Sequence, residues 1–275
     1  MIARILICLT VMVSLVCVAA RADEAEQLDR LFEASRMQDV HRGVPEAILE
    51  GLLDGEDAFV GDIPIAEIEA LAHHHLGAAT LTGDLRGRMA GRLPLADIEA
   101  VLAFFQSDLG RKVADLEAFA ALEDTDHIEA VGAPLYLTIK EWNPERARQI
   151  DLMIELLSEV EWATRTTMNL WYAFLTALYA GPVGDGGMTD EEILAYLNEM
   201  GLGLRSQVDL YLKADYTFTY NELSDAELET YLSFLRSEPG LSFFSEYRES
   251  FAKVFEDRAR AFASEYRLLV GQKRS

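Results

Sequence analysis

One short phrase occurs twice in this chain, and that repetition constrains the fold more than any other feature. The stretch "FFQSDLG" at residues 104–110 returns as "FLRSEPG" at residues 234–240, with Phe, Ser and Gly at the same spacing. Seven residues of segment 93–110 are identical to their counterparts in 223–240. Further upstream, an offset of 125 places Glu67 and Ile68 on Glu192 and Ile193. We therefore predict a tandem duplication of roughly 125 residues, which is the size of one domain.

The residues before each copy have the period of an amphipathic helix. Apolar residues recur at i, i+3, i+4 and i+7, which is one face of a helix. The first copy has Ile98, Val101, Leu102 and Phe105 at these positions, and the second has Leu228, Tyr231, Leu232 and Leu235. Phe104 and Phe234 lie beside this face and widen it, so each helix is expected to pack against more than one neighbour.

The repeated Ser and Gly predict a tight corner that leads into a second helix. Ser107 and Ser237 can each cap the helix that follows, because a serine side chain accepts a hydrogen bond from a free amide of the first turn. Gly110 and Gly240 then provide room for a close approach or for a positive φ. A catalytic serine is the competing interpretation, but neither copy has a histidine nearby in the sequence, so we predict a structural role.

The rest of the sequence also predicts helices, and strand-like alternation with hairpin dipeptides is absent. "SDAE" at 224–227 and "TDEE" at 189–192 have the pattern of capping boxes. Asn143 followed by Pro144 predicts a helix start, and we place the boundary between the halves there. The prediction is an all-α helical bundle of about ten helices, built from two related halves at residues 23–142 and 143–275.

Residues 1–22 have the features of a cleavable signal peptide. A basic residue, Arg4, precedes an apolar run from Ile5 to Val18, and Ala20 and Ala22 fit the small residues at a cleavage site. We expect cleavage after Ala22 and a periplasmic location for the mature protein. Both cysteines of the chain lie within this segment, so no disulfide, thiolate metal site or cysteine nucleophile is expected in residues 23–275.

The charge of the chain limits its partners. The formal net charge is −23, and removal of Arg4 and Arg21 with the signal peptide makes it −25. Such an excess of negative charge repels nucleic acids and anionic lipids, but it does not exclude cationic partners. No later segment is apolar for long enough to span a bilayer.

Three consecutive histidines are the most conspicuous candidate for a metal site. His73, His74 and His75 carry imidazoles, which bind zinc, copper and nickel. Consecutive helical residues point about 100° apart, so the three rings cannot all bind one ion without unwinding of the helix. A surface patch is the favoured interpretation and metal binding an alternative. No catalytic residue and no cofactor is predicted, because no assembled nucleophile, phosphate-binding or glycine-rich motif is present.

Two aromatic segments suggest an apolar binding site if the halves leave a cleft between them. Residues 168–180 are apolar on nearly every side, and residues 240–269 carry aromatic side chains at helical spacing. Trp171, Tyr172 and Phe251 are the candidates for lining such a cleft, although aromatic residues at this spacing mostly fill cores.

The sequence therefore favours binding over catalysis, with an envelope protein, an extended peptide or an apolar small molecule as partner. The alternative is a hydrolase of envelope polymers that uses acidic residues. Two facing carboxylates with pKa values pushed apart would favour the hydrolase. An apolar groove without convergent polar groups would favour binding.

The repeated motif resembles that of exported bacterial proteins with the domain of unknown function 2059. That family is marked by a helix ending in two aromatics, then Ser-Pro, Gly and Lys. The first copy matches at Phe104, Phe105, Ser107, Gly110 and Lys112, with Asp108 in place of the proline. The second copy matches at Phe234, Ser237 and Gly240 and departs at Leu235, Glu238 and Ser242. The resemblance implies an exported helical protein without assigned catalytic residues or ligand.

Overall fold

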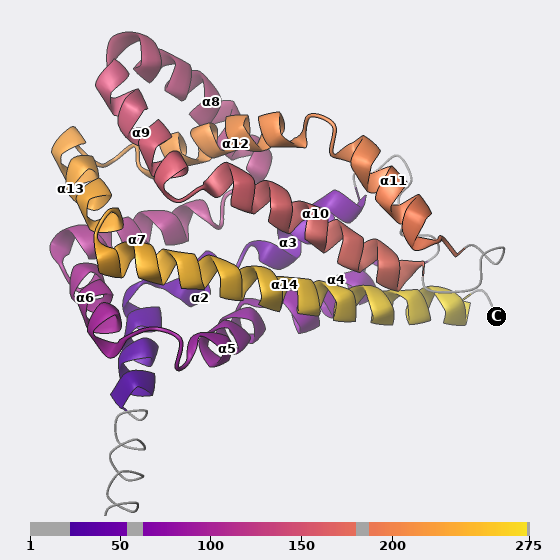
Figure 1. Cartoon of the computed structure of the whole chain (residues 1–275). Coiled ribbons are helices and arrows are strands. Elements are labelled where there is room, and N and C mark those ends of the chain that lie inside the picture. Colours follow the sequence, from indigo (N-terminus) through magenta and orange to yellow (C-terminus); the bar gives the residue numbers. More distant parts are fainter. Residues whose placement is uncertain (1–22, 54–62, 180–186, 274–275) are drawn as a thin grey trace, which may run out of the picture.

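The structure is a computed structural model of the whole chain, and it describes residues 23–53, 63–179 and 187–273 (Figure 1). These residues contain helices and no β-strand, which confirms the predicted all-α bundle of about ten helices. Residues 23–34 form a helix that precedes α2. The further helices are α2 (Met37–Val40), α3 (Val44–Leu53), α4 (Ile65–Leu76), α5 (Ala78–Met89), α6 (Leu95–Phe105), α7 (Asp108–Ala120), α8 (Thr125–Trp142), α9 (Pro144–Leu156), α10 (Glu159–Leu178), α11 (Asp190–Met200), α12 (Leu204–Thr219), α13 (Asp225–Leu235) and α14 (Glu238–Lys273).

Both copies of the repeated motif form the predicted corner between two helices. The four residues of each predicted apolar face, on α6 and on α13, are all buried. The amide of Gly110 donates to Ser107 Oγ over 3.0 Å, and the amide of Gly240 donates to Ser237 Oγ over 3.2 Å. Each serine hydroxyl in turn donates to a carbonyl before the corner, that of Phe104 or Phe234, over 2.6 Å. Each serine side chain therefore connects the end of the helix before the corner to the first turn of the helix after it.

Replacing Ser107 by alanine is expected to lower the free energy of unfolding by about 1 kcal/mol, because the cap of α7 is lost. Ser237→Ala should have a similar effect at the start of α14. Ser264→Ala is a matched control, since its hydroxyl bonds only to the Arg260 carbonyl one turn earlier in the same helix. Urea denaturation of the three variants measures these differences. Equal losses in all three would contradict the capping role.

The two corners pack directly against each other. The rings of Phe104 and Phe234 are stacked with centroids 3.7 Å apart and planes 3° from parallel. Two further pairs of helix contacts are reciprocal: α6 packs on α14 while α13 packs on α7, and α5 packs on α14 while α12 packs on α8. Such an exchange of equivalent contacts is the arrangement seen across a two-fold axis. One difference is that α14 is continuous, whereas the corresponding segment of the first half is interrupted between α7 and α8.

The reciprocal packing gives the two halves shared cores. One cluster combines Val113 with residues of α9, α12 and α13, and a second combines Leu28, Leu31 and the buried face of α6 with Phe243. A third joins Ile68 of α4 to Ile193 of α11, the pair that the sequence offset of 125 aligned. The division of the chain at residue 143 stays a prediction.

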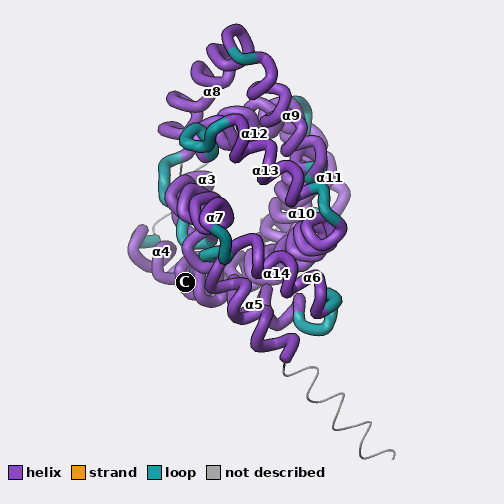
Figure 2. Tube along the Cα trace, turned by 90° about the vertical axis from the view of Figure 1, so that its left-hand side faces the viewer, coloured by secondary structure: helices purple, strands orange, loops and turns teal. Residues whose placement is uncertain are grey.

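Seen along a second direction, the helices surround a central opening, with α3 and α7 on one side and α10, α12 and α13 on the other (Figure 2). No helix among the described residues has both the length and the apolar character needed to cross a membrane. The described residues also contain no cysteine. The predicted signal peptide, residues 1–22, lies outside the described residues.

Candidate ligand-binding cavity

A cavity of about 1060 Å³ opens between helices of the bundle. Both halves of the chain contribute to its wall, through α2, α3, α7 and α8 from the first and through α10, α12, α13 and α14 from the second. Glu46, Ala47 and Asp124 belong to the lining and are exposed, so they mark the side on which the cavity opens to solvent. The volume is at the upper end of the range for small-molecule sites.

Glu117 of α7 forms the first polar group of the wall. The hydroxyls of Tyr220 and Tyr231 both donate to its Oε1, over 2.7 Å and 3.0 Å. Burial raises the pKa of Glu117, and the two tyrosine hydrogen bonds offset part of that rise. Burial also raises the pKa values of both tyrosines well above their usual range, so they remain donors. Neither bond ends on Oε2, and no other hydrogen-bond donor of the described residues reaches this atom.

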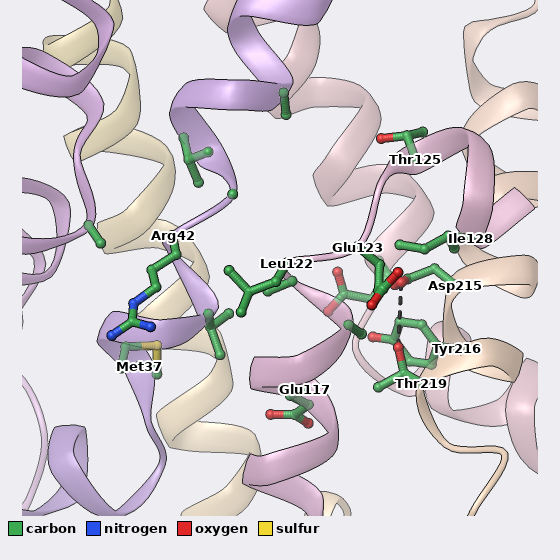
Figure 3. Close-up of a pocket in the computed structure, with 18 of the residues that line it drawn as sticks. Met37, Arg42, Glu117, Leu122, Glu123, Thr125, Ile128, Asp215, Tyr216 and Thr219 are labelled. Atoms are coloured by element: carbon green, nitrogen blue, oxygen red, sulfur yellow. Dashed lines mark hydrogen bonds between the residues drawn. The ribbon is translucent and has the colours of Figure 1, made fainter. Parts of the chain in front are cut away.

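Asp215 of α12 is the second polar group, and it has little support from the protein. Figure 3 shows it beside Tyr216 and Thr219, with a single hydrogen bond from the Thr219 hydroxyl at 3.5 Å. Burial raises the pKa of Asp215 to about 7; the Thr219 hydrogen bond lowers it in part, and the charges of Glu117 and Glu159 add to the rise. Asp215 lies far from the outer surface but lines the cavity. For this reason its side chain is half-buried and not fully enclosed by protein atoms.

A third carboxyl, that of Glu159 on α10, is neutralised by an ion pair. Arg248 Nη1 of α14 lies 3.2 Å from Glu159 Oε1, and both side chains are largely buried. Burial raises the pKa of Glu159, while the charge of Arg248 and its hydrogen bond oppose this rise. The neighbouring Trp162 donates its indole N–H to the Arg248 carbonyl over 3.2 Å. The charged groups in this part of the wall therefore have partners within the protein.

Aromatic rings cover much of the remaining wall. One of them, Tyr247, is held by the buried His41, whose Nε2 lies 3.2 Å from the tyrosine Oη and whose Nδ1 lies 2.9 Å from Thr82 Oγ1. Burial lowers the pKa of His41 to about 4, so this imidazole is neutral at physiological pH. The aromatic residues of the lining are Phe105, Trp162, Tyr211, Tyr216, Tyr220, Tyr231, Phe243, Phe244 and Tyr247.

The charged side chains of the lining are strongly biased towards acids. Seven carboxyl groups face two guanidinium groups and one imidazole. Arg248 pairs with Glu159, and Arg42 pairs with Asp39 over 2.8 Å, so neither guanidinium neutralises Glu117 or Asp215. The acids are Glu46, Glu50, Glu117, Glu123, Asp124, Glu159 and Asp215, and the basic groups are Arg42, His73 and Arg248.

The three aromatic residues proposed from the sequence are not brought together at this wall. Trp171 and Tyr172 pack against the cluster formed by α4, α10, α11 and the end of α14. Phe251 stacks on His41 and Tyr247, with ring centroids 5.1 Å and 5.9 Å away, so it lies behind the wall rather than in it. All three candidates support the core on which the cavity is built.

The histidine triplet lies at the end of α4, and its rings point in different directions. His73 and His74 are exposed, with His73 Nε2 3.4 Å from Glu46, whereas His75 is buried with Nε2 3.3 Å from Glu265. Among the described residues, the group of three side chains close enough to share an ion is Glu50, Asp124 and Asp126, which contains no histidine. Carboxylates often cluster on an acidic surface without a metal, so we assign no ion to it.

Glu117 and Asp215 were missed by the sequence analysis, yet the sequence holds a signal for both. Each occupies an inward position of a helix whose neighbours three and four residues away are apolar or small. Val113, Ala114 and Ala120 surround Glu117 in this way, and Leu212 and Phe218 do so for Asp215. An acid on the apolar face of an amphipathic helix is the pattern to search for, since unpaired buried carboxylates are rare.

Comparison of the chain with protein-family models, with curated proteins and with solved structures finds no significant match. The resemblance of the repeated motif to proteins with the domain of unknown function 2059 therefore stays a prediction.

Proposed function

We propose that this protein is an exported periplasmic binding protein that holds a small molecule or an extended peptide segment in the cavity between its helices. The observation that supports this proposal is the cavity itself, whose size suits a ligand and whose wall combines nine aromatic rings with several carboxyl groups. Such a mixture is typical of sites that bury an apolar body and orient it through a small number of hydrogen bonds.

The alternative of an acid-dependent hydrolase has one observation in its favour, since Glu117 and Asp215 both reach the cavity. General acid catalysis with a second ionised carboxylate requires one raised and one lowered pKa. Here burial raises the pKa of Glu117, Glu159 and Asp215 alike, and no cation of the described residues forms an ion pair with Glu117 or Asp215. Binding is therefore the function that this geometry supports better.

Binding in the cavity can be tested with a neutral apolar dye, 1-N-phenylnaphthylamine, whose fluorescence rises in apolar surroundings. We expect one saturable site on the mature protein. Ala47→Trp places a large side chain at the mouth of the cavity and should weaken dye binding at least tenfold. Ala130→Trp is the matched control, because Ala130 is also exposed on a helix but does not line the cavity. Dye binding that does not saturate, or that Ala47→Trp leaves unchanged, would overturn the proposal.

A further inference from the structure

We propose that the cavity selects organic cations, with an amine or guanidinium group bound by the carboxylates of Asp215 and Glu117 and an apolar body packed on the aromatic wall. This inference rests on the proposed function, because it names the chemical class of ligand for the same site. It follows from the charge balance of the wall, from the hydrogen bonds that its acids lack, and from the chemistry of its rings.

The charge balance of the wall favours a cation. Seven acids and two guanidinium groups line the cavity, and both guanidinium groups have acidic partners of their own. Opposite charges attract more strongly inside a protein than in water, because the effective dielectric constant is lower there. An anion entering this cavity would meet repulsion, whereas a cation would replace the counter-charge that Asp215 and Glu117 lack.

The hydrogen bonds of the two acids also point to a donor from outside the protein. Asp215 accepts one long bond, from Thr219 at 3.5 Å, and the two tyrosine bonds to Glu117 both end on Oε1. A buried carboxylate has room for about four donors. An ammonium group brings three N–H donors and a guanidinium five, so either would supply the missing bonds in charge-assisted form.

The rings of the wall suit the same ligand. Tyr216, Tyr220 and Tyr231 line the cavity together with the two acids, and their ring centroids lie 5.6 Å and 5.7 Å apart in sequence order. A cation over the face of such a ring is attracted by the ring quadrupole, most strongly where water is excluded. Aromatic faces also pack well on an alkyl or aryl body. An amphipathic cation therefore suits a wall that combines carboxylates with aromatic rings.

The affinity for a cation should depend on pH through Asp215. With a pKa of about 7, this carboxyl is largely protonated at pH 6 and largely ionised at pH 8, while an alkylamine stays cationic at both. The affinity is thus expected to rise up to roughly tenfold between these values. The charges that act on Asp215 are those of Glu117 on α7 and of Glu159 on α10, the latter paired with Arg248 of α14. On α12 itself lie Tyr211, Tyr216 and the ion pair of Lys213 with Asp209. On the neighbouring α8 and α9, Tyr136 and Asp151 are hydrogen-bonded to each other.

The test is displacement of 1-N-phenylnaphthylamine at pH 8 by three probes of equal chain length: octylamine, octan-1-ol and octanoate. We expect octylamine to bind about tenfold more tightly than octan-1-ol, and octanoate to bind most weakly. Asp215→Asn should weaken octylamine binding roughly tenfold, abolish its rise between pH 6 and pH 8, and leave octan-1-ol unchanged. Glu249→Gln removes one exposed carboxylate outside the cavity and should change none of these values.

The outcomes separate this inference from the proposed function. If octan-1-ol displaces the dye as well as octylamine does, or if Asp215→Asn leaves their ratio unchanged, the cation selectivity is wrong while binding in the cavity stands. If the dye shows no saturable binding that Ala47→Trp removes, the proposed function fails and the selectivity fails with it.

Discussion

Gly110→Ala is expected to lower the free energy of unfolding by about 3 kcal/mol, the largest loss that we predict for a single methyl group. A Cβ at this position would lie 2.0 Å from the Phe104 carbonyl oxygen and 2.7 Å from the Phe105 Cα. Both are backbone atoms of α6, so no side-chain rotation can relieve the overlap. The corner would have to open, which would separate Phe104 from Phe234 and disturb the cores on both sides.

The measurement is thermal and urea denaturation followed by far-ultraviolet circular dichroism. For a protein of this size, a loss of about 3 kcal/mol corresponds to a midpoint roughly 6 to 12 °C lower. Gly87→Ala is the matched control, since Gly87 lies inside α5 with no atom within 4 Å of a Cβ placed there. That variant should gain about 0.5 to 1 kcal/mol, because alanine favours a helix over glycine. A Gly110→Ala protein that unfolds with the wild type would refute the close approach at the corner.

The local structure of this chain could be predicted well because its signals are local. The capping boxes at Thr189 and Ser224 form as predicted, and Asn143 caps α9 with Pro144 at its first position. Ser107 and Ser237 cap the helices that follow them. Each of these features depends on residues within four positions, where backbone geometry fixes which side chain meets which amide.

The cavity could not be predicted in the same way, because it depends on distant parts of the chain. Glu117 meets tyrosines more than 100 positions away. The pKa of Asp215 is raised mainly by its burial among distant segments, and the charges of Glu117 and Glu159 add to the rise. Among 47 acidic residues, the sequence offers no pairing rule that would select these three. The interruption between α7 and α8 was not predicted from the sequence either. The corresponding length of the second half forms one continuous helix, α14. The interruption brings Leu122, Glu123 and Asp124 to the cavity wall.

Asp215→Asn is expected to stabilise the protein, and to do so only where the carboxyl would be ionised. In the folded state the pKa of Asp215 is about 7, against 3.8 for an ordinary aspartate. Between these values the folded protein binds more protons than the unfolded chain, so stability falls as the pH rises. The full loss is reached above pH 7 and amounts to about 4 kcal/mol at most, from 1.36 kcal/mol per unit. Asparagine has no charge to bury and avoids that loss.

The difference between variant and wild type should therefore be near zero at pH 4, grow through pH 5 and 6, and level off above pH 7. Taking the difference removes the contribution of His41, whose lowered pKa of about 4 makes both proteins less stable as the pH falls below 6.5. Urea denaturation at one-unit intervals measures it, with Glu249→Gln as the variant that should show no such trend. If the difference in the free energy of unfolding between the two proteins did not change with pH, the pKa of Asp215 would not be raised by burial.

A chain that keeps a destabilising carboxylate at the centre of its fold requires a reason beyond stability. Most positions of this kind can be improved by substitution, and those that are retained at a loss of stability are enriched in functional sites. If Asp215 serves to bind a cation, saturating octylamine should stabilise the wild-type protein at pH 8 and narrow its gap to Asp215→Asn, because ligand binding adds to the stability of the state that binds. If octylamine stabilised both proteins by the same amount, the buried carboxyl group of Asp215 would not take part in binding the ligand. The effect of Asp215→Asn on stability, measured once against pH and once against octylamine, therefore gives two independent tests of the role of this carboxyl group.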